Sequence, residues 1–316
     1  MHINMGQITD HKAVYIEINT TSSTHAKSPH WKFNNTILED DSFKNMIYFM
    51  INQKIKETEN SKIFLDEWDI FKDEIKEESI KYATTKNRQM KKRQNMLEDE
   101  INTAYKNNKQ DDKIILEKRK ELEKIQQYIY KGAKIRAGMR SDVTDEILSA
   151  VYLNLEKSTQ NARTIHELKS TNGEIITDKA KIKNILFEHY KNLFEYEREN
   201  EEAQNEILNY SKKLSDFERD ILDEELDFEI FDKALKSLEN EKTPGPDGLT
   251  TEFYKTFFVQ LKPLFEKLVL SILEENRLAT SQTVSIIKLL PKDPKEKTIK
   301  NLRPISLLNV DYKIIT

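Results

Sequence analysis

Apolar residues recur at spacings of three and four in two stretches near the beginning of the chain, which is the pattern of a helix with one apolar face. The first stretch comprises Phe43, Met46, Ile47, Met50 and Ile51. The second comprises Phe64, Trp68, Phe71 and Ile75. Because an apolar face of this kind is stable only when another element covers it, both stretches predict amphipathic helices that pack inward.

A seven-residue apolar repeat follows on both sides of a polar segment. Its first half comprises Met90, Leu97 and Ala104, with Ile101 between them, and its second half Ile115, Leu122 and Ile129, with Ile125 between them. The polar stretch 106–112 provides a turn between the halves. The pattern predicts an antiparallel helical hairpin with coiled-coil-like packing. It leaves open whether the seam closes within one chain or between two.

Cap and turn signals predict several shorter elements farther along. A small hairpin over 165–178 leads into a helix capped by Thr177 or Asp178. That helix is expected to bury Ile182, Ile185, Leu186, Tyr190 and Leu193. Ser215 and Glu218 form a capping box for the next helix, and residues 228–238 predict another.

The last quarter begins with Thr-Pro-Gly-Pro-Asp-Gly-Leu at 243–249, where two prolines and two glycines predict a rigid turn. A helix is expected from Thr250 or Thr251 to about Arg277. Residues 284–290 and 302–307 then predict two paired strands. The loop between them carries Pro291, Pro294, Lys292, Lys295, Lys297 and Lys300. The fold class expected is α+β, predominantly α-helical.

Composition narrows the class of protein. Charged residues make up 34% of the chain, against about 25% in an average domain, and mean hydropathy is −0.74, which favours an elongated, surface-rich molecule. The absence of cysteine excludes disulfides and thiolate zinc sites and suits an intracellular protein, nuclear or cytoplasmic. No apolar run reaches the length of a membrane span, so no membrane partner is expected.

Charge is segregated along the chain. Residues 195–232 contain 15 acidic and 4 basic residues, a net of −11, so the rest of the chain carries +7 within a total of −4. Two basic runs stand out in that remainder: Lys81, Lys86, Arg88, Lys91, Lys92 and Arg93, and then Lys131, Lys134, Arg136 and Arg140. Such runs are typical of nucleic-acid backbone contact, although a run alone also fits a solvated helix face.

Three blocks in the last quarter resemble the opening blocks of a reverse transcriptase. They are the 243–249 turn, Ile-Ile-Lys-Leu-Leu-Pro-Lys at 286–292, and Asn-Leu-Arg-Pro-Ile-Ser-Leu-Leu at 301–308. Their order and spacing are similar to those in the polyproteins of non-LTR (LINE-type) retrotransposons, which join an endonuclease to a reverse transcriptase. The resemblance implies that the strand hairpin belongs to the fingers of the polymerase.

The same resemblance implies roles for single residues. The arginine of the Arg-Pro-Ile block contacts the triphosphate of the incoming nucleotide, and the match falls on Arg303. A guanidinium suits this role because its planar donors meet phosphate oxygens in pairs. Lys288 and Lys292 are candidates for further charges on the same phosphates or on the template. The alternative is that these lysines are only solvent-exposed charges at the tip of an exposed hairpin and bind no ligand.

The beginning of the chain resembles the last strand of the endonuclease domain. In Thr-Asp-His-Lys-Ala-Val-Tyr at 9–15, Asp10 and His11 match a Ser-Asp-His motif of that domain, with Thr9 in place of serine. The metal ligands of the nuclease would lie before Met1. Asp10 and His11 are therefore expected to be a non-functional remnant.

Catalytic carboxylates of the polymerase palm, an aromatic-x-Asp-Asp turn among them, do not occur in this sequence. Asp111-Asp112 and Asp40-Asp41 are interpreted as turn and cap residues, and Asp311 as a helix cap. No metal or cofactor is expected here, whereas the full-length family uses Mg²⁺. Whether the chain is itself an enzyme is left open.

The predicted organisation has three parts: residues 1–20 as the endonuclease remnant, 21–160 as a helical linker, and 161–316 as the beginning of a reverse transcriptase. The predicted function is that of a fingers fragment, inactive alone, that contacts an RNA template and a DNA target or primer. The alternative is a non-catalytic helical scaffold. The oligomeric state is left open.

Overall fold

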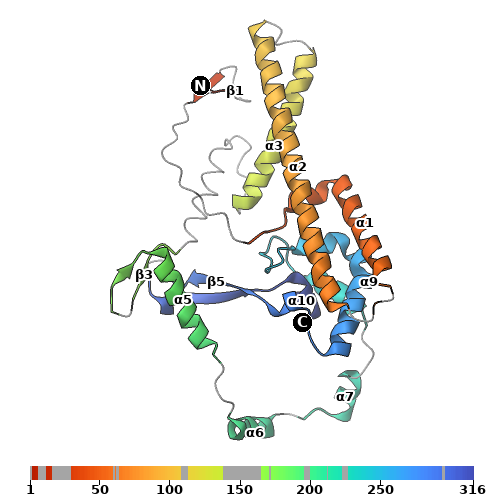
Figure 1. The fold of residues 1–316 in the computed structure, drawn as a ribbon, viewed down its shortest axis with the longest axis vertical. Helices are drawn as coiled ribbons and strands as arrows, with labels where there is room; N and C mark the ends of the chain where they lie inside the picture. The colour runs from red at the N-terminus through yellow and green to blue at the C-terminus, as the bar shows by residue number, and fades with distance from the viewer. Residues whose placement is uncertain are drawn as a thin grey trace. The chain divides into compact units, whose positions relative to one another are not determined.

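The computed structural model describes residues 2–5, 12–15, 30–59, 61, 64–107, 113–137, 165–170, 172–195, 200–211, 213–222, 227–293 and 296–316. Helices dominate this part of the chain, and its strands form three antiparallel pairs (Figure 1). The predicted α+β, mainly helical fold class is therefore confirmed. Two compact units are present, Met1–Ile47 with Lys72–Thr164 and Tyr48–Phe71 with Ile165–Thr316. The boundaries predicted at 20 and 160 stay predictions about domains of a polyprotein.

The first unit contains strands β1 (His2–Met5) and β2 (Lys12–Tyr15), which pair with each other, and the 3-10 helix η1 (Asn35–Glu39). Helix α1 (Asp41–Glu57) and helix α2 (Leu65–Lys106) each contribute residues to both units. Helix α3 (Lys113–Ala137) lies in the first unit. Phe43 of α1 is fully buried, packing on Phe33 and on the ring of Tyr82.

Helices α2 and α3 form the antiparallel hairpin that the seven-residue repeats predict. Arg93 binds Glu121, and farther toward the turn Lys118 binds Glu100, so the two helices run in opposite directions. Leu97 and Ile101 of α2 are fully buried. The α3 side of the seam is less enclosed, since Ile129 remains 43% exposed.

The second unit contains helices α5 (Lys179–Leu193), α6 (Glu201–Tyr210), α7 (Asp216–Leu222), α8 (Glu229–Ser237), α9 (Thr251–Glu275) and α10 (Val310–Ile315). The predicted caps are present. The side chain of Asp178 accepts from Lys181 N at 2.8 Å, and Ser215 and Glu218 form the expected reciprocal pair. At the start of α9, expected at Thr250 or Thr251, the side chain of Thr250 accepts from Phe253 N at 3.3 Å.

Aromatic side chains from distant parts of the sequence form the core of this unit. Phe64 directly before α2, and Trp68 and Phe71 at its beginning, are all buried, and the ring of Trp68 lies 6.2 Å from that of Phe265 in α9. Phe265 also contacts Phe231 of α8. The inward packing predicted for the second apolar stretch is confirmed, because the face recurring at three and four is the face that α9 covers.

Two strand pairs belong to the same unit. Strand β3 (Leu168–Lys169) pairs with β4 (Ile175–Ile176), and β5 (Ile286–Pro291) pairs with β6 (Leu302–Leu307). The 3-10 helix η2 (Thr280–Thr283) precedes β5, and η3 (Ile299–Asn301) precedes β6. Within the described ranges, no helix has both the length and the apolar content that crossing a bilayer requires.

Candidate nucleotide-binding hairpin

The β5–β6 hairpin carries the cations that the sequence singles out, and its register brings two of them together. Lys288 pairs with Ile305, and Leu290 pairs with Arg303. Because opposite residues of an antiparallel pair share a face, Lys288 and Arg303 are diagonal neighbours on one side of the hairpin. Arg303 is exposed and Lys288 is half-buried. The structure therefore groups two positive charges on a single strand surface, here called the cation face.

Near the loop, the other side of the hairpin packs against β3 and α5. Leu289 and Leu302 pack into a cluster with Leu168 of β3 and Ile182 of α5, and Figure 1 shows α5 and β3 beside this end of the hairpin. Leu289 and Leu302 point away from the cation face, because their partners in the ladder are Pro304 and Pro291. Packing on one side thus leaves the side with Lys288 and Arg303 facing away from α5.

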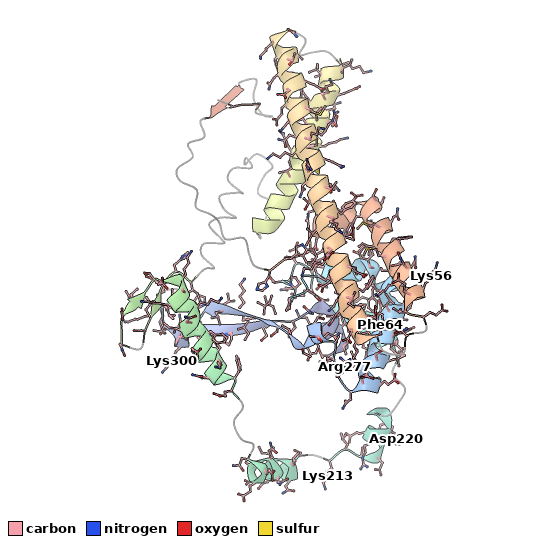
Figure 2. All side chains as sticks on the ribbon, in the orientation of Figure 1. Lys56, Phe64, Lys213, Asp220, Arg277 and Lys300 are labelled. Atoms are coloured by element: carbon pink, nitrogen blue, oxygen red, sulfur yellow. The ribbon has the colours of Figure 1, made fainter. Side chains whose placement is uncertain are left out.

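Polar contacts shape the loop between β5 and β6. The backbone N–H of Lys292 donates to Asn301 O at 2.8 Å, which carries the ladder one residue beyond β5. The buried Asn301 side chain donates to the carbonyls of Asp293 and Glu296, both at 2.6 Å. Lys292 and Lys300 are exposed, and Lys300 lies at the loop end of the hairpin (Figure 2). The side chain of Asn301 therefore holds the lysine-rich loop predicted from the sequence in place through two hydrogen bonds.

The Pro-Gly-Pro-Asp-Gly turn meets the chain where β6 passes into α10. A Cβ at Gly245 would lie 2.3 Å from Asn309 Oδ1 and 2.4 Å from Asn309 N, so only glycine permits this approach. Asp247 N–H donates to Asn309 Oδ1 at 3.2 Å, and Asn309 Nδ2 donates to Ser281 O at 2.8 Å. Asn309 occupies the N-cap position of α10, but its side chain serves these long-range contacts.

Asp311 differs from its predicted role as a helix cap. It lies inside the first turn of α10, is fully buried, and accepts a hydrogen bond from Trp68 Nε1 at 2.8 Å. Gln282 donates to the same carboxylate oxygen at 3.3 Å. The cap position falls two residues earlier, at Asn309, because the backbone ahead of Val310 is extended there. Because Asp311 is buried and accepts hydrogen bonds from Trp68 and Gln282, it links α10 to α2 and to η2.

Tyr254 of α9 lies close to this polar region. Its side chain is 1% exposed, and its hydroxyl meets no hydrogen-bond partner within the part of the chain that the structure describes. Burial raises the pKa of Tyr254 well above its ordinary value, and the negative charges of Asp311, Asp247 and Asp69 raise it further. The phenol therefore stays protonated over the physiological range and is not a general base.

The first basic run is divided by ion pairs within the chain. Lys81 binds Glu78 at 2.6 Å, Lys86 binds Asp40 at 2.7 Å, and Arg93 makes two bonds of 2.7 Å to Glu121. These pairs raise the pKa values of Lys81 and Arg93 and lower that of Glu121. Arg88, Lys91 and Lys92 are exposed and form no ion pair with any described carboxylate. They are the cations of this run that remain available to a polyanion.

The remaining candidate residues are placed only in part. Lys131, Lys134 and Arg136 fall within the bounds of α3. Arg140, Asp10 and His11 lie outside the described residues, although the strand expected after His11 is present as β2. No described group of histidines, cysteines and carboxylates is arranged to hold a metal ion.

The chain is similar in sequence to a known transposon protein. No family model matches the chain. Over 326 aligned positions it is 26% identical to the Transposon TX1 uncharacterized 149 kDa protein of Xenopus laevis, an alignment that covers 99% of this chain. The chain spans 24% of the length of that protein. The similarity confirms the resemblance to a transposon protein that the motifs indicated, and extends it over nearly all of the chain.

Proposed function

We propose that this chain is part of a non-LTR retrotransposon polyprotein and that its β5–β6 hairpin is the fingers element of a reverse transcriptase, which binds the triphosphate of the incoming nucleotide. The observation that carries the proposal is the register that puts Lys288 and Arg303 on one face of the hairpin, while Leu289 and Leu302 on the other face pack against α5. Polymerisation itself is proposed only for a longer protein, because the palm aspartates are not in this sequence.

The chemistry of the cation face suits a triphosphate. The Arg303 guanidinium offers two parallel N–H donors to phosphate oxygens. Lys288 adds a compact charge one diagonal step away, and Lys292 continues the same strand toward the loop. The described residues do not form a site that would hold Mg²⁺, so no step is assigned to the ion in this chain.

The RNA template and the DNA primer or target are proposed partners of the same chain. Their contacts are expected from Arg88, Lys91 and Lys92 on α2, which face solvent. Phosphate contacts of this kind are independent of sequence and weaken as salt is raised.

The test is the affinity of the 316-residue chain for a fluorescent deoxynucleoside triphosphate. Arg303→Ala is expected to weaken binding by about 1.5–3 kcal/mol, the usual value of a hydrogen bond to a charged group. Arg303→Lys should restore only part of the loss, because an ammonium cannot form the paired bonds of a guanidinium. Arg277→Ala is the matched control, since Arg277 is exposed and makes only long surface ion pairs of 3.9 and 3.7 Å. Equal affinity for wild type and Arg303→Ala would refute the proposal.

A second candidate is a non-catalytic helical scaffold. The observation in its favour is the set of exposed apolar residues on α3, where Ile114 is 61% and Leu116 43% exposed. Sedimentation equilibrium together with duplex binding separates the two functions. Self-association without salt-dependent binding of an RNA–DNA duplex would favour the scaffold.

A further inference from the structure

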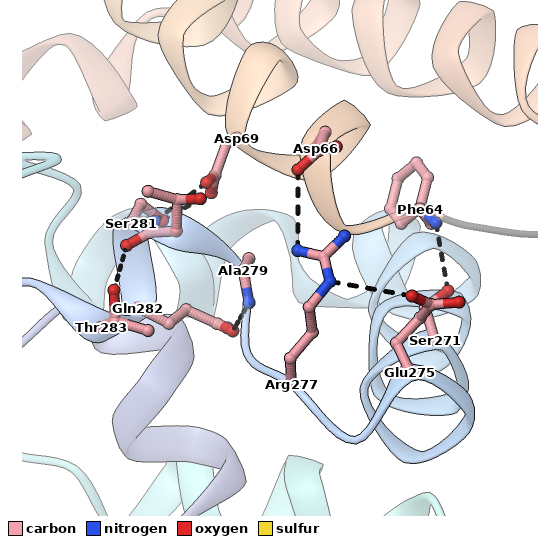
Figure 3. Close-up of polar contacts among 11 residues, drawn as sticks. Phe64, Asp66, Asp69, Ser271, Glu275, Arg277, Ala279, Ser281, Gln282 and Thr283 are labelled. Carbon is pink, nitrogen blue, oxygen red and sulfur yellow. Dashed lines mark hydrogen bonds and ion pairs between the residues drawn. The ribbon is translucent and has the colours of Figure 1, made fainter.

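The segment that leads into β5 and the segment that follows β6 are both hydrogen-bonded to residues at the beginning of α2. On the β5 side, Ser281 of η2 donates its backbone N–H to Asp69 Oδ2 at 2.9 Å and its hydroxyl to Asp69 Oδ1 at 2.6 Å (Figure 3). On the β6 side, Trp68 Nε1 donates to Asp311 of α10 at 2.8 Å. Two successive residues of α2 thus hold the segments that enter and leave the hairpin.

The two ends are also tied to each other. Asn309 follows β6, and its side-chain amide donates to Ser281 O. Ser281, which bonds to Asp69, is therefore also bonded to the segment that leaves β6. Gln282 bonds to Asp311, the partner of Trp68. Trp68, Asp69, Ser281, Asn309 and Asp311 therefore form a continuous polar connection at the base of the hairpin, here called the base clamp.

The contacts of the base clamp are of a strong kind. Asp69 uses both carboxylate oxygens for one serine, and hydrogen bonds to an ionised acceptor are shorter and stronger than neutral ones. The Trp68–Asp311 bond is buried, as Trp68 is 1% and Asp311 0% exposed, so water does not compete for it. A two-stranded hairpin is marginally stable by itself, so its direction depends on what holds its base and its covered face.

We infer that Trp68 and Asp69 are positioning residues for the cation face: by holding the base of the hairpin they set the direction in which Arg303 is presented. This inference rests on the proposed function, in which Arg303 binds a triphosphate. It also gives the beginning of α2 a role that its pattern as an amphipathic helix does not suggest. Neither side chain touches the nucleotide in this arrangement, because both are engaged at the base.

The experiment compares Asp69→Asn and Trp68→Phe with Asp66→Asn in the full chain. Asparagine is uncharged and has one acceptor oxygen, so Asp69→Asn weakens the contact with Ser281, and Trp68→Phe keeps an aromatic ring but loses the indole donor. Asp66 lies on the same turn of α2, but its side chain is 74% exposed. Its ion pair with Arg277 is long, at 3.9 Å, so Asp66 is the control. Two quantities are measured: amide hydrogen exchange of residues 286–307, and affinity for the fluorescent deoxynucleoside triphosphate.

The expected result is faster exchange across the hairpin and a roughly two- to tenfold weaker affinity in Asp69→Asn and Trp68→Phe, with both quantities unchanged in Asp66→Asn. Unchanged exchange in both variants would overturn the base clamp. Faster exchange with full, Arg303-dependent affinity would overturn the positioning role. If Arg303→Ala leaves affinity unchanged, the proposed function fails, and hydrogen exchange alone then decides whether the clamp exists.

Discussion

Asp40 joins the start of α1 to α2 through two side chains. It accepts a hydrogen bond from Lys86 at 2.7 Å and one from Tyr82 at 2.6 Å. The bond from Lys86, followed by that from Tyr82, lowers the pKa of Asp40 to about 2. Burial and the bond to Asp40 raise the pKa of Tyr82 to about 12. Lys86 also lies 5.3 Å from the ring centre of Tyr128 in α3, so this cluster connects three helices.

Asp40→Asn is expected to remove an acid-dependent part of the stability. A carboxyl group whose pKa is lowered on folding stabilises the protein above its unfolded value of 3.8, and the contribution is lost as pH falls toward 2. The melting temperature of wild type should therefore exceed that of Asp40→Asn at neutral pH, and the difference should shrink below about pH 4. Asp41→Asn is the control, because the Asp41 side chain is 90% exposed. A difference that does not change with pH would contradict the assignment.

Residue roles that depend on a distant partner could not be predicted from the sequence. Asp178 was predicted as a cap, with Thr177 as the alternative, since a cap needs only a backbone N–H three residues away. Asp311 was misassigned because its partner, Trp68, is 243 positions away. The only signal for Asn309 is its place before a short helix, which says nothing about Ser281 or Asp247.

The elements themselves follow local rules, and most were predicted closely. β6 has the predicted bounds, while β5 begins two residues late because the extended backbone at Val284 precedes the first paired residue, Ile286. Leu193, expected to be buried, is 59% exposed, because the cluster around Leu168 uses α5 only as far as Leu186. Periodicity identifies the apolar face of a helix but not how far along it the neighbouring elements extend.

The α2–α3 hairpin provides a test at the scale of elements. Leu97→Asp would put a carboxylate at a fully buried position and should cost several kcal/mol. Leu122→Asp should cost less, because Leu122 is only half-buried, and Met96→Asp least, because Met96 is 44% exposed. Urea denaturation followed by circular dichroism measures the order. Equal stability of the Leu97 and Met96 variants would show that the seam is not packed.

At the scale of the whole molecule, the compact units are not continuous stretches of the sequence. Residues 48–71 share a unit with 165–316, although the pattern of the sequence places them in a helical linker. The apolar face of Phe64, Trp68 and Phe71 predicts burial but cannot identify α9 as the covering element, since every apolar surface is an equivalent partner. The cation face could be anticipated from the motif containing Arg303, whereas the base clamp became visible only in the assembled unit.

Nucleic-acid binding should depend on which cations the fold leaves free. Arg88 and Lys92 are exposed on one face of α2 and form no ion pair with any described carboxylate, whereas Lys81 and Arg93 are paired with Glu78 and Glu121. Each phosphate contact contributes about 0.9 to the slope of log K against log salt for duplex DNA. The double change Arg88→Gln/Lys92→Gln should therefore lower the slope by up to about 2, and Lys81→Gln/Arg93→Gln by much less. The affinity for an RNA–DNA duplex, measured between 50 and 200 mM salt in steps of roughly 50 mM, provides both slopes. Equal slopes for the two double variants would mean that pairing within the chain does not decide which cations contact phosphate.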